Sequence, residues 1–186
     1  MARLSSFIMV SLDGCYADAR GDMSFAHRDD AEMRQFSAES ARGGGGLVFG
    51  RVTYEMMTHY WPTPLAKKND PEVAESMNAR PKFVVSKTLQ QATWNNTRIV
   101  QGDLAREIQK LKDESPVDLA ILGSGALVAA LASLELIDRY DVMINPVILG
   151  AGKRLFAGIS RPPGLALEKT RAFANGCVLA SYVAHR

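Results

Sequence analysis

Residues 117–156 constrain the fold of this chain more than any other stretch. A short apolar run at residues 117–122 breaks at the sequence Gly-Ser-Gly, residues 123–125, and apolar residues then recur at helical spacing. This pattern predicts a strand, a tight turn and a helix. A second apolar run follows at residues 140–149 and ends in a glycine-rich basic turn at residues 150–154. The whole stretch is typical of a βαβ unit.

The Gly-Ser-Gly turn is a candidate phosphate site. The first turn of a helix leaves N–H groups unpaired at the positive end of the helix dipole, and glycine lets a ligand approach the backbone. The alternative is a purely structural turn. It is not a dinucleotide-binding G-x-G-x-x-G fingerprint, because Val128 occupies the last glycine position. The turn at residues 150–154 is not a P-loop either, since Arg154 follows its lysine and Val147 replaces its first glycine.

The remaining segments predict strands that alternate with helices. The expected strands are residues 4–12, 47–49, 82–85 and 99–100, and the expected helices begin near residues 29, 50, 70 and 103. Residues 16–28 show no period and are expected to form a binding loop or lid. Asn175 and Gly176 predict a hairpin turn near the C-terminus. We therefore expect one α/β domain, residues 1–186, with a mostly parallel central sheet flanked by helices and closed by an antiparallel C-terminal hairpin.

Composition narrows the range of functions. A chain of 186 residues with 47% hydrophobic residues and a net charge of +2 gives no reason to expect nucleic acid or a membrane as partner. Its two cysteines lack C-x-x-C spacing, and its three histidines share no spacing with each other or with a nucleophile, so neither a metal site nor a hydrolytic triad is expected. No segment approaches the length and apolarity of a membrane span or a signal peptide. We expect a cytoplasmic protein with a small-molecule substrate.

Three turns each follow directly on a predicted strand. They are Gly50-Arg51, Ser86-Lys87 and Gly123-Ser124. Open α/β sheets bind ligands at the carboxyl edge, where these turns should meet. A phosphorylated dinucleotide is a plausible ligand, and the charges of Arg51 and Lys87 suit the additional phosphate of NADP. The alternatives are that Arg51 only pairs with Glu55 on its own helix and that Lys87 is an ordinary loop lysine.

Five motifs occur in order along the chain. They are SLDG at residues 11–14, GRVTYE at 50–55, VSK at 85–87, GSG at 123–125 and NPVILGAGKRLF at 145–156. Over nearly its whole length the chain resembles the dihydrofolate-reductase-like superfamily, specifically the reductase domain of the bifunctional riboflavin-biosynthesis deaminase/reductase and its stand-alone relatives. The resemblance implies a dihydrofolate-reductase-like sheet, bound NADPH and hydride transfer to a heterocycle, such as a 5-amino-6-(5-phosphoribosylamino)uracil-type pyrimidine or a pterin-like compound.

The resemblance also implies which residues contact the cofactor. By match to the motifs these are Gly50, Arg51, Val52, Thr53, Ser86 and Lys87, with Gly123, Ser124, Gly125, Ala126 and Leu127 covering the pyrophosphate. The sequence departs from the family in two ways. The zinc-binding pattern of the deaminase half is absent, so no deaminase activity is expected. In addition, Cys15 intervenes before the aromatic residue Tyr16 that follows SLDG.

The substrate side is predicted from residue type. Reduction of a ring containing nitrogen needs a proton source, and a carboxylate in a dry cleft with a raised pKa would suit. Asp13, at a strand end, is the first candidate, and the resemblance also implies that it faces the substrate. Asp30 is the second, because Asp29 fits a helix cap better. Further candidates for substrate contact are Tyr54 and Trp61, which could instead pack in the core, and Lys153, as a solvated or phosphate-binding cation.

Three functions are consistent with these patterns. The leading hypothesis is an NADPH-dependent reductase. The alternatives are a true dihydrofolate reductase, which would turn over folate, and a non-catalytic NADP-binding module, which would bind cofactor without turnover. The C-terminal hairpin is a candidate homodimer interface, by analogy with the family and because sheet edges tend to pair.

Overall fold

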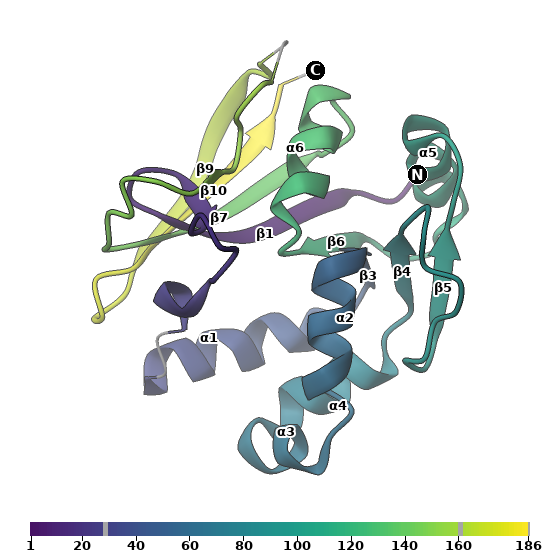
Figure 1. Ribbon diagram of the computed structural model, residues 1–186, viewed down its shortest axis with the longest axis horizontal. Coiled ribbons are helices and arrows are strands. Elements are labelled where there is room, and N and C mark those ends of the chain that lie inside the picture. Colours follow the sequence, from purple (N-terminus) through teal and green to yellow (C-terminus); the bar gives the residue numbers. More distant parts are fainter. Residues whose placement is uncertain (28–29, 160–161, 186) are drawn as a thin grey trace.

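A computed structural model of the chain has an eight-stranded sheet at its centre (Figure 1). It describes residues 1–27, 30–159 and 162–185. The strands are β1 (Leu4–Ser11), β3 (Gly46–Gly50), β4 (Lys82–Val85), β5 (Thr97–Val100), β6 (Leu119–Leu122), β7 (Arg139–Asn145), β9 (Leu165–Ala172) and β10 (Val178–Ala184). Their order across the sheet is β5-β4-β3-β6-β1-β7-β10-β9. The first six strands of this order are parallel, and β10 and β9 complete the sheet as an antiparallel hairpin, which confirms the expected fold class.

Helices cover both faces of the sheet. They are α1 (Ala31–Arg42), α2 (Arg51–Tyr60), α3 (Pro64–Asn69), α4 (Pro71–Ala79), α5 (Leu104–Glu114) and α6 (Gly125–Ser133). The apolar residues of α5 and α6 pack in one core with β1 and β6, while α1, α2 and α4 contribute to two smaller cores on the opposite face (Figure 1). A two-stranded ribbon of β2 (Cys15–Ala17) and β8 (Lys153–Arg154) and a short 3-10 helix, η1 (Ser24–Ala26), lie outside the main sheet.

The central position of β1 follows from its sequence. Leu4, Ile8 and Val10 alternate along one side of the strand and are buried in the core with α5 and α6. Phe7 and Met9 point to the other side and pack against the core beside α1. A strand that is apolar on both sides needs neighbours on both edges and cover on both faces, and β1 has them between β6 and β7.

Several expectations about single elements needed correction. The run expected as a strand to residue 149 ends as β7 at Asn145, before Pro146, which has no N–H to donate to a sheet. α2 ends at Tyr60, and Pro64 begins α3, a short helix that the sequence did not predict. The Thr63 side chain caps α3 by accepting a hydrogen bond from the Ala66 N–H, and proline fits its first position. The described part of the stretch expected as a loop, residues 16–27, includes the end of β2 and the whole of η1.

The N-terminal cap of α1 also differs. Asp29, the expected cap, lies outside the described residues. Asp30 is the N-cap, and its Oδ1 accepts a hydrogen bond from the Met33 N–H at 2.9 Å. Asp30 therefore takes the role that was assigned to its neighbour.

Two kinds of feature are absent from the described residues. Within residues 1–27, 30–159 and 162–185, no helix is long and apolar enough to cross a membrane. The same part of the chain has no group of three or more His, Cys, Asp or Glu side chains that could hold a metal ion.

Candidate functional site

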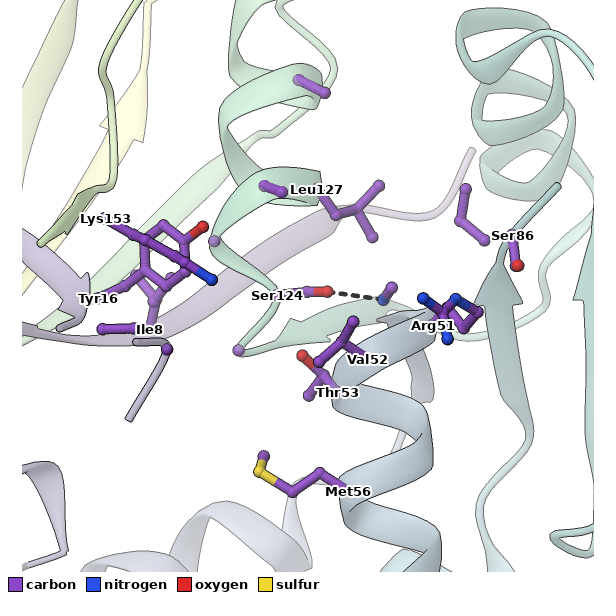
Figure 2. Close-up of a pocket in the computed structure, with 18 of the residues that line it drawn as sticks. Ile8, Tyr16, Arg51, Val52, Thr53, Met56, Ser86, Ser124, Leu127 and Lys153 are labelled. Carbon is purple, nitrogen blue, oxygen red and sulfur yellow. Dashed lines mark hydrogen bonds between the residues drawn. The ribbon is translucent and has the colours of Figure 1, made fainter. Parts of the chain in front are cut away.

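A pocket of about 750 Å³ lies at the carboxyl ends of the parallel strands (Figure 2). Its lining includes the three turns expected to meet there, at Gly50-Arg51, Ser86-Lys87 and Gly123-Ser124. The parallel pairing of β3 with β4 and β6 brings these turns together, because all three strands end at one edge. The size is that of a pocket for a cofactor or a small molecule.

Two helices begin at this pocket. The first turns of α2 and α6 supply Arg51, Val52 and Thr53 and Gly125, Ala126 and Leu127 to its lining. Neither helix has a side-chain cap hydrogen bond at its N-terminus. Their unpaired N–H groups and two positive dipole ends therefore favour an anionic ligand between them.

The turn glycines are required by the protein's own packing. A Cβ on Gly50 would lie 2.2 Å from the Ser124 Oγ, and that oxygen accepts a hydrogen bond from the Gly50 N–H at 2.8 Å. Gly123 and Ser124 both have φ of 60°, a left-handed conformation. A Cβ on Gly125 would lie 2.4 Å from the ring of Tyr16. The sequence-based explanation, that glycine admits a ligand, is therefore incomplete.

Figure 2 shows Arg51 and Ser86 at one end of the pocket, and Lys87, which follows Ser86 in the chain, also lines it. The Arg51 Nη1 donates to both carboxylate oxygens of Glu55 at 3.0 Å, so the alternative pairing within α2 is present. Both side chains remain more than 40% exposed, and such a surface pair is weak. Arg51 can therefore exchange Glu55 for a ligand at little cost.

Ser86 has a structural role at the same end. Its Oγ accepts hydrogen bonds from the N–H groups of Thr88 and Leu89, at 3.2 and 2.9 Å, and this turns the chain after β4. Its hydroxyl proton can still be donated to a ligand. Lys87 is exposed and lines the pocket beside it.

The opposite end is built by the β2–β8 ribbon and the loop after it. Figure 2 shows Tyr16 and Lys153 at this end, and the pocket lining also includes Asp22 and His27. Lys153 was a candidate for substrate contact, whereas Tyr16, Asp22 and His27 were not proposed as site residues. The only sequence signal was the aperiodic stretch at residues 16–28, which indicated a binding loop without indicating which side chains face the pocket.

The sequence matches the model of the RibD C-terminal domain over residues 3–179. The chain belongs to the RibD C-terminal domain family. Its curated relatives include YyaP of Bacillus subtilis (strain 168), described as uncharacterised, which is 26% identical over 176 residues covering 94% of this chain and 91% of YyaP. YwjB of the same organism, described likewise, is 22% identical over 173 residues, 93% of each chain.

Solved structures show the same fold in relatives of this RibD-family domain. A protein described as a riboflavin biosynthesis protein, from Shewanella sp. PV-4, superposes with a TM-score of 0.75 at 24% identity over the whole of both chains. A diaminohydroxyphosphoribosylaminopyrimidine deaminase/5-amino-6-(5-phosphoribosylamino)uracil reductase from Thermotoga maritima superposes with a TM-score of 0.67 at 15% identity, over 99% of this chain and 57% of that chain.

Asp13 does not have the environment expected of a proton donor in this RibD-family domain. Its carboxylate accepts hydrogen bonds from the Ser11 hydroxyl at 2.7 Å and from the Leu149 and Gly150 N–H groups at 3.1 and 2.9 Å. The Ser11 hydroxyl, followed by these N–H groups, lowers the pKa of Asp13 to about 2, opposite to the expected rise. Asp13 is absent from the described pocket lining and instead joins the turn after β1 to the loop after β7.

Three other predicted substrate contacts lie elsewhere in the RibD-family domain. Asp30 caps α1, and the Met33 N–H lowers the pKa of its carboxyl, so it is also unsuited to donate a proton. Tyr54 is 2% exposed, and its hydroxyl accepts from the N–H groups of Thr93 and Trp94 in the core. Trp61 packs beside that core and donates from Nε1 to the Met57 sulfur. The described pocket lining includes none of these three residues.

Proposed function

We propose that this chain is an NADPH-dependent reductase. The observation that carries the proposal is the pocket at the carboxyl edge of the sheet, where the N-termini of α2 and α6 meet and Arg51 and Lys87 supply two cations. Membership of the RibD C-terminal domain family supports an oxidoreductase. A phosphorylated dinucleotide matches this combination, because its pyrophosphate suits helix N-termini and its additional phosphate suits a nearby arginine.

Different residues would bind the two phosphate groups of the cofactor. The backbone N–H groups of Gly125, Ala126 and Leu127, with the Ser124 hydroxyl, would hold the pyrophosphate. Arg51 and Lys87, with Ser86, would hold the phosphate on the adenosine ribose. When bound, the reduced nicotinamide supplies a hydride to an electrophilic carbon of the substrate.

The substrate would bind beside Tyr16 and Lys153. The pocket lining offers three side chains of a type that can transfer a proton, Tyr16, His27 and Lys153. Asp22 suits this task less, because the Ser24 hydroxyl lowers the pKa of its carboxyl. Positioning of the two reactants against each other would supply much of the rate. The substrate class that we propose is a heterocycle of the pyrimidine or pterin type, in line with the 5-amino-6-(5-phosphoribosylamino)uracil reductase from Thermotoga maritima.

Titration with NADPH and, separately, with NADH tests the cofactor. Energy transfer from Trp61 and Trp94 to the bound nicotinamide reports binding. We expect NADPH to bind at least about tenfold more tightly than NADH, because a charged contact to the additional phosphate contributes about 1.5–3 kcal/mol. Absence of binding by either nucleotide would remove the reductase proposal. Binding without turnover of any pyrimidine, pterin or dihydrofolate would favour the non-catalytic module, and turnover of dihydrofolate would favour a dihydrofolate reductase.

We also propose that the chain forms a homodimer through its C-terminal hairpin. β9 is one of the two edge strands of the sheet, and one of its edges has no neighbouring strand among the described residues. Leu165 and Leu167 on this strand are 39% and 58% exposed. A second copy would cover these apolar side chains and pair the open edge.

A further inference from the structure

Tyr16 reaches the pocket through an irregularity in the β2–β8 ribbon. Cys15 pairs with Arg154 and Ala17 pairs with Lys153, so two steps along β2 correspond to one step along β8. Tyr16 is the additional residue of this bulge. Bulges redirect side chains and are common beside active sites. The neighbours Cys15 and Ala17 are buried, whereas the Tyr16 side chain lines the pocket.

The Tyr16 ring lies directly on the first residue of α6. A Cβ on Gly125 would lie 2.4 Å from Cδ1 and 2.5 Å from both Cε1 and Cγ of that ring. Three ring atoms at nearly equal distance mean that the face of the ring, and not its edge, covers Gly125. Any side chain at position 125 would displace the ring. Tyr16 and Gly125 therefore form one unit that determines the shape of the pocket at the start of α6.

The unit stands at the end of the pocket opposite to the phosphate-binding candidates. Figure 2 shows Tyr16 with Lys153 and Ile8 on one side and Arg51 with Ser86 on the other, with the N-terminus of α6 between them. Under the proposed function, on which this step rests, a dinucleotide held by its phosphates at Arg51 and the helix N-termini extends its nicotinamide towards Tyr16. Ile8, a 1% exposed side chain of β1, gives this end an apolar floor.

We propose that Tyr16, supported by Gly125, is the positioning residue for the nicotinamide ring. The flat face of the tyrosine ring provides a surface against which a planar ring packs, and its contact with the glycine backbone restricts its rotation. A bulged residue on a two-stranded ribbon reaches this place without disturbing the main sheet. Correct placement of the ring against the substrate governs the rate of hydride transfer.

Calorimetric titrations of the full chain with two ligands test the proposal. NADPH carries the nicotinamide, whereas adenosine 2′,5′-bisphosphate carries only the adenosine and its phosphates. Tyr16→Ala should raise the Kd of NADPH roughly three- to tenfold, which is the range for the loss of one aromatic contact. It should leave the Kd of the bisphosphate unchanged. It should also reduce the fluorescence enhancement of bound NADPH, because the ring is held less rigidly. Tyr16→Phe should bind both ligands like the wild type.

Gly125→Ala provides a second route to the same result. The added methyl group displaces the Tyr16 ring, so this variant should also lose more affinity for NADPH than for the bisphosphate. Tyr16→Leu keeps apolar volume for folding if the alanine variant does not fold. Tyr60→Ala is the matched control, since Tyr60 is a half-buried tyrosine absent from the described pocket lining, and it should leave both ligands unchanged.

Each other outcome overturns the inference. If Tyr16→Ala weakened the binding of both ligands equally, the substitution would act on the phosphate site or on folding and not on the nicotinamide. If it tightened NADPH binding, the wild-type ring would obstruct the nicotinamide instead of positioning it. Unchanged NADPH binding would show that the ring does not contact the nicotinamide. Failure of the wild type to bind either ligand would instead remove the proposed function, so the two failures are distinguishable.

Discussion

The Ser124 Oγ accepts a hydrogen bond from the Gly50 N–H at 2.8 Å. This bond joins the residue before α6 to the residue before α2, although the two are far apart in the sequence. It holds the two helix N-termini at a common pocket. Ser124 makes the bond from a left-handed conformation, with φ of 60° and ψ of 58°, which is costly for any residue with a side chain. The contact thus offsets local backbone strain.

Two substitutions at Ser124 should separate these effects. Ser124→Ala removes the acceptor of the Gly50 N–H and should lower the free energy of unfolding by about 1 kcal/mol. Ser124→Gly removes the same acceptor but relieves the left-handed strain, so it should be more stable than Ser124→Ala by about 1 kcal/mol. Urea denaturation of the three proteins measures both differences. Equal stability of the two variants would mean that the strain is negligible.

Arg51→Ala should distinguish the two nicotinamide nucleotides. If Arg51 binds the additional phosphate, its loss should raise the Kd of NADPH roughly 10- to 100-fold and change that of NADH little. Glu55→Gln is the matched control. It removes the ion-pair partner of Arg51 and should change the free energy of unfolding by no more than about 0.5 kcal/mol. It should bind NADPH as tightly as the wild type or more tightly. An equal loss of affinity for both nucleotides in Arg51→Ala would exclude the assigned role.

Asp13 should contribute to stability in a pH-dependent way. Hydrogen bonds lower its pKa in the folded chain from 3.8 to about 2, so the folded state favours the carboxylate more than the unfolded state does. The contribution is complete above pH 3.8 and is lost as the pH falls towards 2. The difference in stability between the wild type and Asp13→Asn should therefore shrink over this interval. Denaturant midpoints measured across it provide the test, and a difference that stays constant with pH would contradict the assignment.

Leu167→Glu should dissociate the proposed homodimer. It places a charge on the edge strand β9, where an apolar interface would have to desolvate it. Sedimentation velocity should show the wild type as a dimer and the variant as a monomer. Leu65→Glu is the control, because Leu65 on α3 has the same exposed fraction, 58%. A monomeric wild type, or equal behaviour of both variants, would remove the hairpin as the interface.

Local patterns in the sequence were sufficient to locate most elements. The helical spacing of apolar residues after Asp103 predicted α5, and the Asn175-Gly176 pair predicted the β9–β10 hairpin. These signals work because a helix, a cap or a tight turn depends on residues that are neighbours in the chain. The meeting of three turns in one pocket was also predictable, since parallel strands end at a common edge.

Contacts between distant residues were decided only by the tertiary structure. The pKa of Asp13 is lowered, and not raised as expected, by the Ser11 hydroxyl and by the Leu149 and Gly150 N–H groups, which the position of β1 beside β7 brings to its carboxylate. The bulge of the β2–β8 ribbon laid the Tyr16 ring on Gly125, although no local pattern connects the two. The environment of a side chain depends on which strands lie next to each other and in which register, and neither is encoded by the spacing of residues within one element.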